Sequence, residues 1–425
     1  MVKYYKKEIL NPLVLSCFIV AIVFYTGLIP IKNKNCFRSL VGFKNLVEVS
    51  GVVDSNPVKT AKGKHYKLNL KVSSVKDKKG AVYNAKGIIQ VLVSYSQVEA
   101  HFPGKLFTEI KNNKYIPCEQ GSVLSIKGKA LEDTFFLAKS IKTSEQKNNK
   151  FFNKVLKIRA LFRIHFRRLM FAWENAGGLL LALLTGIREY TEKNVTTAFC
   201  NAGLSHILAL SGMHLNLFSN IAQKTSEKFL SLRKTMFVKL SAIIFFVFFA
   251  GFSPSLFRAF LCTLITYLVL FLKIKNFKMI SVLALSFLIH ISIKPTDLFE
   301  VAFILSYSSL LGILIFSDFF NLHLSSFIPN YLCNALSASI SAQIFTIPIS
   351  LKIFGTFTPI GIISTVIVSP LISIFIYFGI FMIILCLIFP IFVSPAAFFL
   401  KILYTLIVCI VSFFAQFPIF KLEGI

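Results

Sequence analysis

The stretch Gly203-Leu-Ser-His-Ile-Leu-Ala-Leu-Ser-Gly-Met-His214 holds two histidines, two serines and a Ser-Gly pair, within sequence that is apolar almost without interruption from Val195 to the C-terminus. Polar groups are costly in hydrocarbon, so ionisable residues at membrane depth are functional candidates. The Ser211-Gly212 pair also interrupts helix propensity, and a broken helix at that depth is tolerated only where it lines a cavity or is buried in protein. The stretch therefore predicts a helix break at the centre of a membrane region.

The composition of the chain favours a membrane protein with anionic partners. Mean hydropathy is +0.72 and hydrophobic residues make up 55% of the 425 residues, far above what a soluble surface allows. The net charge is +28, from 46 Lys and Arg against 18 Asp and Glu. This charge fits lipid headgroups or nucleic acid as partners. The alternative is a positive-inside signal with solvated lysines in the loops.

The apolar runs predict a polytopic α-helical protein with an N-terminal anchor at residues 1–30. Lys3, Lys6 and Lys7 precede the run Leu13–Ile29, so we expect a retained anchor with a cytoplasmic N-terminus. A cleaved signal peptide is the alternative, but no small-x-small cleavage site follows the run. Further spans are expected near 237–252, 254–273, 277–293, 298–317, 331–355, 358–389 and 395–417. The region 358–389 is long enough for either one or two passes.

Residues 34–145 differ from the rest and predict a small β-domain, which the anchor would place outside the cytoplasm. Five short runs alternate apolar and polar residues between turn signals, namely 47–53, 66–72, 88–93, 122–128 and 135–141. This pattern is typical of an oligonucleotide-binding (OB) type barrel, which binds single strands through a basic groove with stacking aromatics. The alternative is that the rings are core and the lysines protect strand edges. Cys36 and Cys118 are a candidate disulfide in an oxidising compartment.

Residues 146–170 form a basic, amphipathic stretch that predicts an interfacial helix on the membrane. Binding of DNA phosphates is the second interpretation, and the two are compatible because each face can serve one role. The candidate DNA-binding residues are Lys154, Lys157, Arg159, Arg163, Arg167 and Arg168.

Five motifs, in order along the chain, resemble the ComEC-type competence protein family. They are Leu184-Thr-Gly-Ile-Arg188, Phe199–Leu215 around the opening stretch, Ser253-Pro-Ser-Leu-Phe-Arg258-Ala, Pro295–Tyr307 and Ala342–Gly355. The resemblance covers most of residues 35–420. It implies a DNA-uptake channel of the bacterial inner membrane, over residues 176–425, that passes single-stranded DNA to the cytoplasm. It also implies an exported, OB-like N-terminal domain.

The resemblance further implies which residues and partners serve the channel. A pore for a polyanion needs sparse donors and positive charge, and the pore or gate candidates are Arg188, His206, Ser211, Gly212, His214 and Arg258. Many family members carry a metallo-β-lactamase-like domain, a nuclease, but this chain has no HxHxDH pattern. We therefore expect no enzyme activity here, and the degradative activity is absent, supplied by a separate nuclease, or not needed. A cytoplasmic DNA helicase or translocase is the other candidate partner, besides DNA and the bilayer.

Two other function classes are kept as alternatives. An intramembrane serine protease would use Ser211 as nucleophile with His290 as a distant base, although a complete G-x-S-x-G arrangement is lacking. A small-solute transporter would need broken helices in paired repeats, which the sequence does not display. No HExxH motif or acidic partner lies near the histidines, so neither a metal nor a cofactor is expected.

Overall fold

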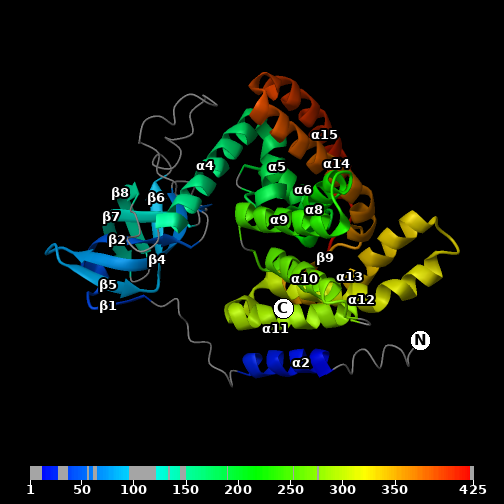
Figure 1. Ribbon diagram of the computed structural model, residues 1–425, viewed down its shortest axis with the longest axis horizontal. Helices are drawn as coiled ribbons and strands as arrows, with labels where there is room; N and C mark the ends of the chain where they lie inside the picture. Colours follow the sequence, from blue (N-terminus) through cyan, green and yellow to red (C-terminus); the bar gives the residue numbers. More distant parts are fainter. Residues whose placement is uncertain are drawn as a thin grey trace. The chain divides into compact units, whose positions relative to one another are not determined.

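The computed structural model describes residues 12–26, 37–54, 57–60, 65–94, 121–132, 135–143, 150–188, 190–251, 253–274 and 277–421 (Figure 1). The chain forms two compact units. Residues 32–172 make one, and residues 1–31 together with 173–425 make the other. We call them the barrel unit and the helical unit. Cys36 and Cys118, the predicted disulfide, lie outside the described residues.

Five strands of the barrel unit close on themselves. They are β2 (Leu46–Val53), β4 (His65–Asp77), β6 (Ile88–Ser94), β7 (Val123–Glu132) and β8 (Phe135–Thr143). Each pairs with its neighbour in the order β2-β4-β6-β8-β7 and back to β2, with β6 and β8 parallel and the other pairs antiparallel. The short strands β1 (Arg38–Ser39), β3 (Val58–Lys59) and β5 (Val82–Lys86) extend this sheet, and η1 (Phe43–Asn45) precedes β2. This order is that of a Greek-key barrel of the OB type, as predicted.

The barrel core follows from the period-two pattern of its strands. Along β4, Leu68 and Leu70 are fully buried, while Asn69 between them is only partly buried. Tyr66 is 2% exposed, so this ring belongs to the core. This agrees with the interpretation of the aromatic rings as core residues and not with a role in stacking on bases. Gly51 and Gly128 sit at register shifts in the ladders, and a Cβ on either would collide with a facing backbone carbonyl. These glycines allow the strands to coil tightly enough to close.

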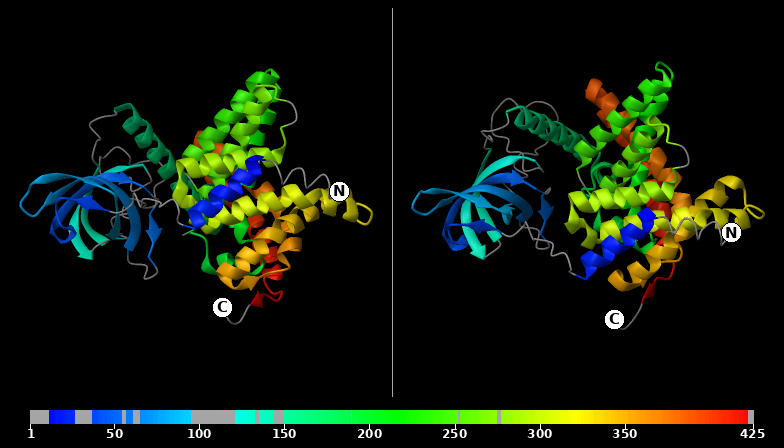
Figure 2. Two further views of the ribbon diagram at one scale, coloured as in Figure 1. Left: turned by 90° about the horizontal axis from the view of Figure 1, so that it is seen from below. Right: turned by 60° about the horizontal axis from the view of Figure 1, so that its bottom comes forward.

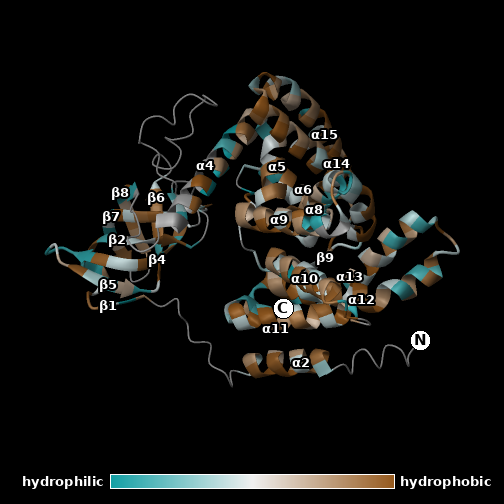
Figure 3. Cartoon of the chain, in the orientation of Figure 1, coloured by the Kyte–Doolittle hydropathy of each residue, from teal (hydrophilic) through white to brown (hydrophobic). Residues whose placement is uncertain are grey.

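The helical unit contains the candidate membrane spans, and the predicted polytopic α-helical fold is confirmed. Within the described residues, five helices are long and apolar enough to cross a bilayer: α10 (Pro254–Phe271), α12 (Val301–Leu324), α13 (Asn330–Phe354), α14 (Gly361–Ile388) and η3 with α15 (Pro390–Phe414). The other helices are α2 (Pro12–Tyr25), α5 (Glu174–Thr185), α6 (Lys193–Asn201), α7 (Ser205–Leu208), α8 (Gly212–Glu227), α9 (Leu232–Ala250) and α11 (Met279–Ile293), with η2 at Pro295–Phe299. Hydrophobic residues dominate α14 and α15 (Figure 3). The region 358–389 is one helix that contains Pro370, so the single pass is correct.

Helix α5 forms the centre of the helical unit. Every residue from Ala176 to Thr185 is buried. Helices α14 and α15 pack against it, with Leu180 seated against Gly379 of α14. The helix ends at Gly186, whose φ of 74° is left-handed and is a conformation that glycine adopts without strain.

Helices α2 and α11 run parallel and side by side (Figure 2). Near their N-terminal ends, Val14 packs with Ala284, and the Cys17 thiol lies 3.3 Å from the Ala284 carbonyl. Near their C-terminal ends, the rings of Tyr25 and Phe299 are 5.5 Å apart. The N-terminal ends of α2 and α11 therefore lie at the same end of the helical unit.

Candidate functional site

The stretch around Gly203–His214 is broken twice. Helix α6 ends in a turn at Gly203, whose φ is +73°. The four-residue helix α7 follows, and the chain then becomes extended at Ala209 and Ser211 before α8 begins. The predicted break at Ser211-Gly212 is thus present, and the sequence did not reveal the additional turn at Gly203.

The turn at Gly203 packs directly on the start of α14. A Cβ on Gly203 would lie 2.7 Å from the Gly361 Cα, closer than real Cβ atoms approach. The Ser364 hydroxyl, also on α14, donates a 2.7 Å hydrogen bond to the Ala202 carbonyl. This hydrogen bond and the backbone contact hold the first break against a candidate span.

Ser211 and His214 form a capping box at the N-terminus of α8. The Ser211 hydroxyl accepts from the His214 backbone N–H, and His214 Nδ1 accepts from the Ser211 backbone N–H at 3.2 Å. Since Nδ1 is the acceptor, the neutral ring carries its proton on Nε2. His214 is 1% exposed, and its Nε2 has no hydrogen-bond partner among the described residues.

Two arginines lie beside the break and donate to backbone carbonyls, Arg188 to α7 and Arg258 to α12. Arg188 Nε donates to the Leu208 carbonyl at 3.3 Å, at the end of α7. Arg258 Nη1 donates to the Ser306 carbonyl at 2.7 Å, and its guanidinium lies 5.9 Å from the centre of the Tyr307 ring. Its Nη2 would be 3.7 Å from a Cβ on Gly212, so Arg258 adjoins the α8 N-terminus.

The structure therefore brings most of the six pore or gate candidates together. Arg188, Ser211, Gly212, His214 and Arg258 surround the two breaks through the contacts just described. His206 lies on α7 with an exposed side chain, and it is close enough to His214 for their charges to interact.

Several buried polar atoms near the breaks lack a protein partner among the described residues. They are His214 Nε2, Arg258 Nε and Gln343 Oε1. Gln343 reaches the same region, because its Nε2 would lie 3.6 Å from a Cβ on Gly361. Buried polar groups normally have partners, and leaving one without costs about 1–3 kcal/mol. A polar ligand or water that passes these atoms would satisfy them.

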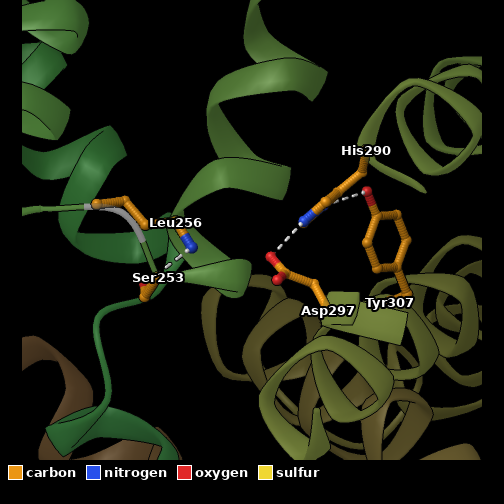
Figure 4. A network of polar contacts seen from close by, with 5 residues as sticks. All are labelled: Ser253, Leu256, His290, Asp297 and Tyr307. Carbon is orange, nitrogen blue, oxygen red and sulfur yellow. Dashed lines mark hydrogen bonds and ion pairs between the residues drawn. The ribbon is translucent and has the colours of Figure 1, made fainter. Parts of the chain in front are cut away.

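A second buried polar cluster was missed by the sequence reasoning. His290 Nε2 lies 3.1 Å from Asp297 Oδ2, and His290 Nδ1 lies 3.3 Å from the Tyr307 hydroxyl (Figure 4). His290 is fully buried, and Phe257 and Phe303 meet its ring edge-on at 4.8 Å. The signal was present, since Asp297 and Tyr307 both belong to the Pro295–Tyr307 motif and His290 had been noted separately.

The protease alternative finds little support in these contacts. The Ser211 hydroxyl lies 3.1 Å from His214 Nδ1, but both groups are engaged in the capping box. His290, the base named for that mechanism, contacts Asp297 and Tyr307 instead. The described residues also hold no group of three His, Cys, Asp or Glu side chains suited to a metal ion.

Helix α4 (Lys150–Ala172) carries the candidate DNA-binding residues. Arg159, Arg163 and Arg167 recur every four residues, hence on one face, and are only 8%, 2% and 7% exposed. Phe162, by contrast, is 60% exposed. Phe166, Leu169 and Met170 are buried as well, so the buried residues of α4 include both arginines and apolar side chains. Arg168 is half-buried, and the side chains of Lys154 and Lys157 lie outside the described ones. A DNA-binding role for this helix stays a prediction.

Comparison with known proteins identifies relatives of the helical unit. A family model described as Competence protein matches residues 183–424, more than half of the chain. ComE operon protein 3 of Bacillus subtilis (strain 168) is 26% identical over 197 residues, which cover 46% of this chain and 25% of that protein. The matched part thus spans a quarter of that relative's length. No solved structure gives a significant match.

Proposed function

Because the chain belongs to the Competence protein family, we propose that its helical unit is an inner-membrane channel that admits single-stranded DNA to a bacterial cell. The strand passes the broken helix at Ser211–His214. The observation that carries this proposal is the set of buried polar atoms without protein partners around that break. Two of these atoms, His214 Nε2 and Arg258 Nε, are donors, and phosphate and base oxygens are acceptors that such donors recognise.

His214 is the donor best suited to this task. Its ring is fixed by the capping box through Nδ1, which leaves the Nε2 proton available. A neutral donor with a fixed orientation can contact a passing phosphate without trapping it, as conduction requires weak binding along a path. Arg258 supplies the permanent charge beside Gly212, and its bond to the Ser306 carbonyl limits how far it moves.

The basic residues that precede α2 and α11 support an orientation of the helical unit in the membrane. Lys3, Lys6 and Lys7 precede α2 in the sequence, and Lys278 precedes α11. Since α2 and α11 are parallel, Lys278 lies at the end of the helical unit where α2 begins, and Lys3, Lys6 and Lys7 precede α2 in the sequence. By the positive-inside rule that end faces the cytoplasm. The opposite end, where α2 leads toward the barrel unit, then faces outward.

In this proposal the barrel unit is extracytoplasmic and receives the incoming strand. Its strand order is that of a fold which often binds single strands. Helix α4 is the second candidate for this contact. A nuclease and a cytoplasmic helicase or translocase, supplied as other chains, complete the pathway.

The test is the uptake of labelled DNA into a form that external DNase cannot reach. Deletion of the gene should abolish uptake, and the intact gene should restore it. His214→Asn is the sharpest variant, because the shorter side chain keeps an acceptor near the Nδ1 position and removes the Nε2 donor. We expect it to accumulate normally and to fail in uptake. His323→Asn is the matched control, since that side chain is exposed on α12.

Uptake that is unchanged by deletion would refute the channel. Normal uptake by His214→Asn would remove His214 from the path and leave the rest of the proposal to be tested at Arg258.

A further inference from the structure

Helix α8 carries a row of amide side chains that begins one turn after the break. Polar residues recur along it at intervals of four, three and four positions, namely Asn216, Asn220, Gln223 and Glu227. Residues at this spacing lie on one face of a helix. Asn216 and Glu227 are exposed, and Asn220 and Gln223 are half-buried. We call Asn216, Asn220 and Gln223 the amide stripe.

The opposite face of α8 is apolar and contacts α9. The ring of Phe218 lies 5.2 Å from the ring of Phe246 and 6.4 Å from that of Phe245, centre to centre. Two positions separate Phe218 from Asn216, which turns it well away from the stripe. Apolar packing thus attaches α8 to α9, and Asn216 stays exposed on the other side of the helix.

The amide stripe follows a candidate membrane span. At the start of α8, a Cβ on Gly212 would lie 3.4 Å from the Ala259 Cβ of α10. Near the other end, the Lys239 ammonium donates to Gln223 Oε1 at 2.7 Å and lies 6.0 Å from the centre of the Tyr267 ring of α10. Both helices therefore run in the same direction, and about 17 Å of α8 separates the two contacts.

Amides at this depth require polar surroundings. Helix α10 is long and apolar enough to cross a bilayer, and Asn216 and Asn220 lie between the two points at which α8 approaches it. Polar side chains within membrane segments face the bundle interior or a water-filled cavity. An exposed Asn216 therefore indicates a hydrated path along this face of α8.

We propose that the amide stripe is the binding track along which the single strand passes from the broken helix to the cytoplasmic end of the helical unit. This inference rests on the proposed function and adds the part of the path that follows His214. A side-chain amide offers both donors and an acceptor, so it can contact phosphate oxygens and base edges alike. Uncharged contacts of one kind, repeated along a helix, hold a polyanion weakly enough for it to move.

The track ends among basic residues. Lys224 and Lys228 are exposed, and Lys239 is half-buried beside Gln223. Glu227 lies at this end as well, where its carboxylate accepts from the Gln223 amide, and the lysines outweigh its charge. Since lysines attract phosphates, positive charge increases along the stripe. A strand that leaves the break is therefore drawn toward the end that the proposed orientation assigns to the cytoplasm.

A helix that turns its amides to the cytoplasm without contacting DNA is the competing explanation. Water would reach the stripe in that case too, but a strand in transit would not cover it. The two accounts differ in whether a strand held in the channel protects Asn216 and Asn220 from a reagent dissolved in water.

The experiment uses cysteine variants of the full chain in cells that take up DNA. Asn216→Cys and Asn220→Cys are made in a background from which other reactive thiols are removed by replacing Cys36, Cys118, Cys200 and Cys409. A strand biotinylated at its trailing end is stalled with streptavidin, and labelling by a small, water-soluble thiosulfonate is timed. We expect both positions to react, and the stalled strand to slow the reaction about tenfold, as for a ligand at about ten times its dissociation constant.

Thr225→Cys is the matched control on the same helix. Thr225 is exposed and lies nine positions after Asn216, on the opposite face of α8, so the stalled strand should not change its labelling. Uptake supplies a second measurement. Asn220→Leu should lose about tenfold, the scale of one hydrogen bond in a binding step, whereas Asn220→Gln keeps the amide and should retain most uptake. Thr225→Leu should match the unaltered protein.

Two results overturn the track and leave the channel in place, provided that uptake still requires this chain. One is labelling of Asn216→Cys and Asn220→Cys at the same rate with and without the stalled strand. The other is no labelling at either position, since the stripe would then face lipid or protein. Normal uptake by Asn220→Leu also overturns the track. Uptake that persists after deletion of the gene refutes the channel and the track together.

Discussion

The contact between Gly203 and Gly361 predicts that a single methyl group at residue 203 strongly destabilises the helical unit. Gly203→Ala has two costs in the structure. A non-glycine residue at φ +73° loses about 1–2 kcal/mol. Its Cβ would also lie 2.7 Å from a backbone atom of Gly361, and overpacking of this kind costs about 1–3 kcal/mol. The expected loss of unfolding free energy is therefore about 2–5 kcal/mol.

Gly355→Ala is the matched control for this experiment. Gly355 has a similar φ of +65°, but a Cβ there has no atom within 4 Å, so only the backbone cost of about 1–2 kcal/mol applies. The measurement is unfolding of both variants in mixed detergent and dodecyl sulfate micelles, followed by circular dichroism. If Gly203→Ala loses no more stability than Gly355→Ala, α6 and α14 are not closely packed at this point, and the description of the first break is wrong.

Three further predictions follow from other contacts. Arg258→Lys should abolish DNA uptake with normal protein levels, because one ammonium cannot both bond the Ser306 carbonyl and cover Tyr307 as the guanidinium does; uptake at the normal rate would contradict this. Lys239 of α9 lies over the Tyr267 ring in the C-terminal half of α10, so the N-terminal end of α9 belongs to the end assigned to the cytoplasm. With Cys36, Cys118, Cys200 and Cys409 replaced, an impermeant maleimide should label Thr296→Cys in intact cells, and Lys234→Cys only after permeabilisation; the reverse pattern would invert the orientation. Burial, and to a lesser extent Arg168, lowers the pKa of His165 below its ordinary 6.5, so the folded chain favours the neutral ring. The stability from this group is complete above 6.5 and is lost as the pH falls below it. Urea unfolding on both sides of 6.5 should show this loss, and His165→Asn should remove it.

The broad fold could be predicted because it depends on local patterns. Alternation in residues 66–72 predicts a strand with Leu68 and Leu70 inside, and β4 has both buried. Long apolar runs predict helices, and α10 begins at Pro254 as its sequence suggests. The sequence alone did not decide whether residues 358–389 cross the membrane once or twice, because Pro370 is compatible with a kinked helix as well as with a turn.

The details of the site depended on residues far apart in the sequence. The Ser211-Gly212 break is a local signal, but the turn at Gly203 is fixed by Gly361, more than 150 residues away. Likewise, no periodicity brings Asp297 to His290, because η2 must first reverse the chain. The sequence of α4 predicts an amphipathic helix, but its buried residues include Arg163 and Arg167 as well as Phe166, because a pattern alone does not say which side of a helix is covered.

Helix α5 has a consequence for how the protein is made. Its 12 residues reach about 18 Å, well short of the about 30 Å of a hydrocarbon core. It cannot be inserted as an independent span, although it is buried by α14 and α15. These partners are synthesised almost 200 residues later. Residues Ala176–Thr185 therefore remain outside their buried environment until α14 and α15 have entered the membrane. Assembly of the unit is thus completed from the C-terminus back to its centre, and a nascent chain interrupted before α14 would expose this apolar segment to quality-control proteases.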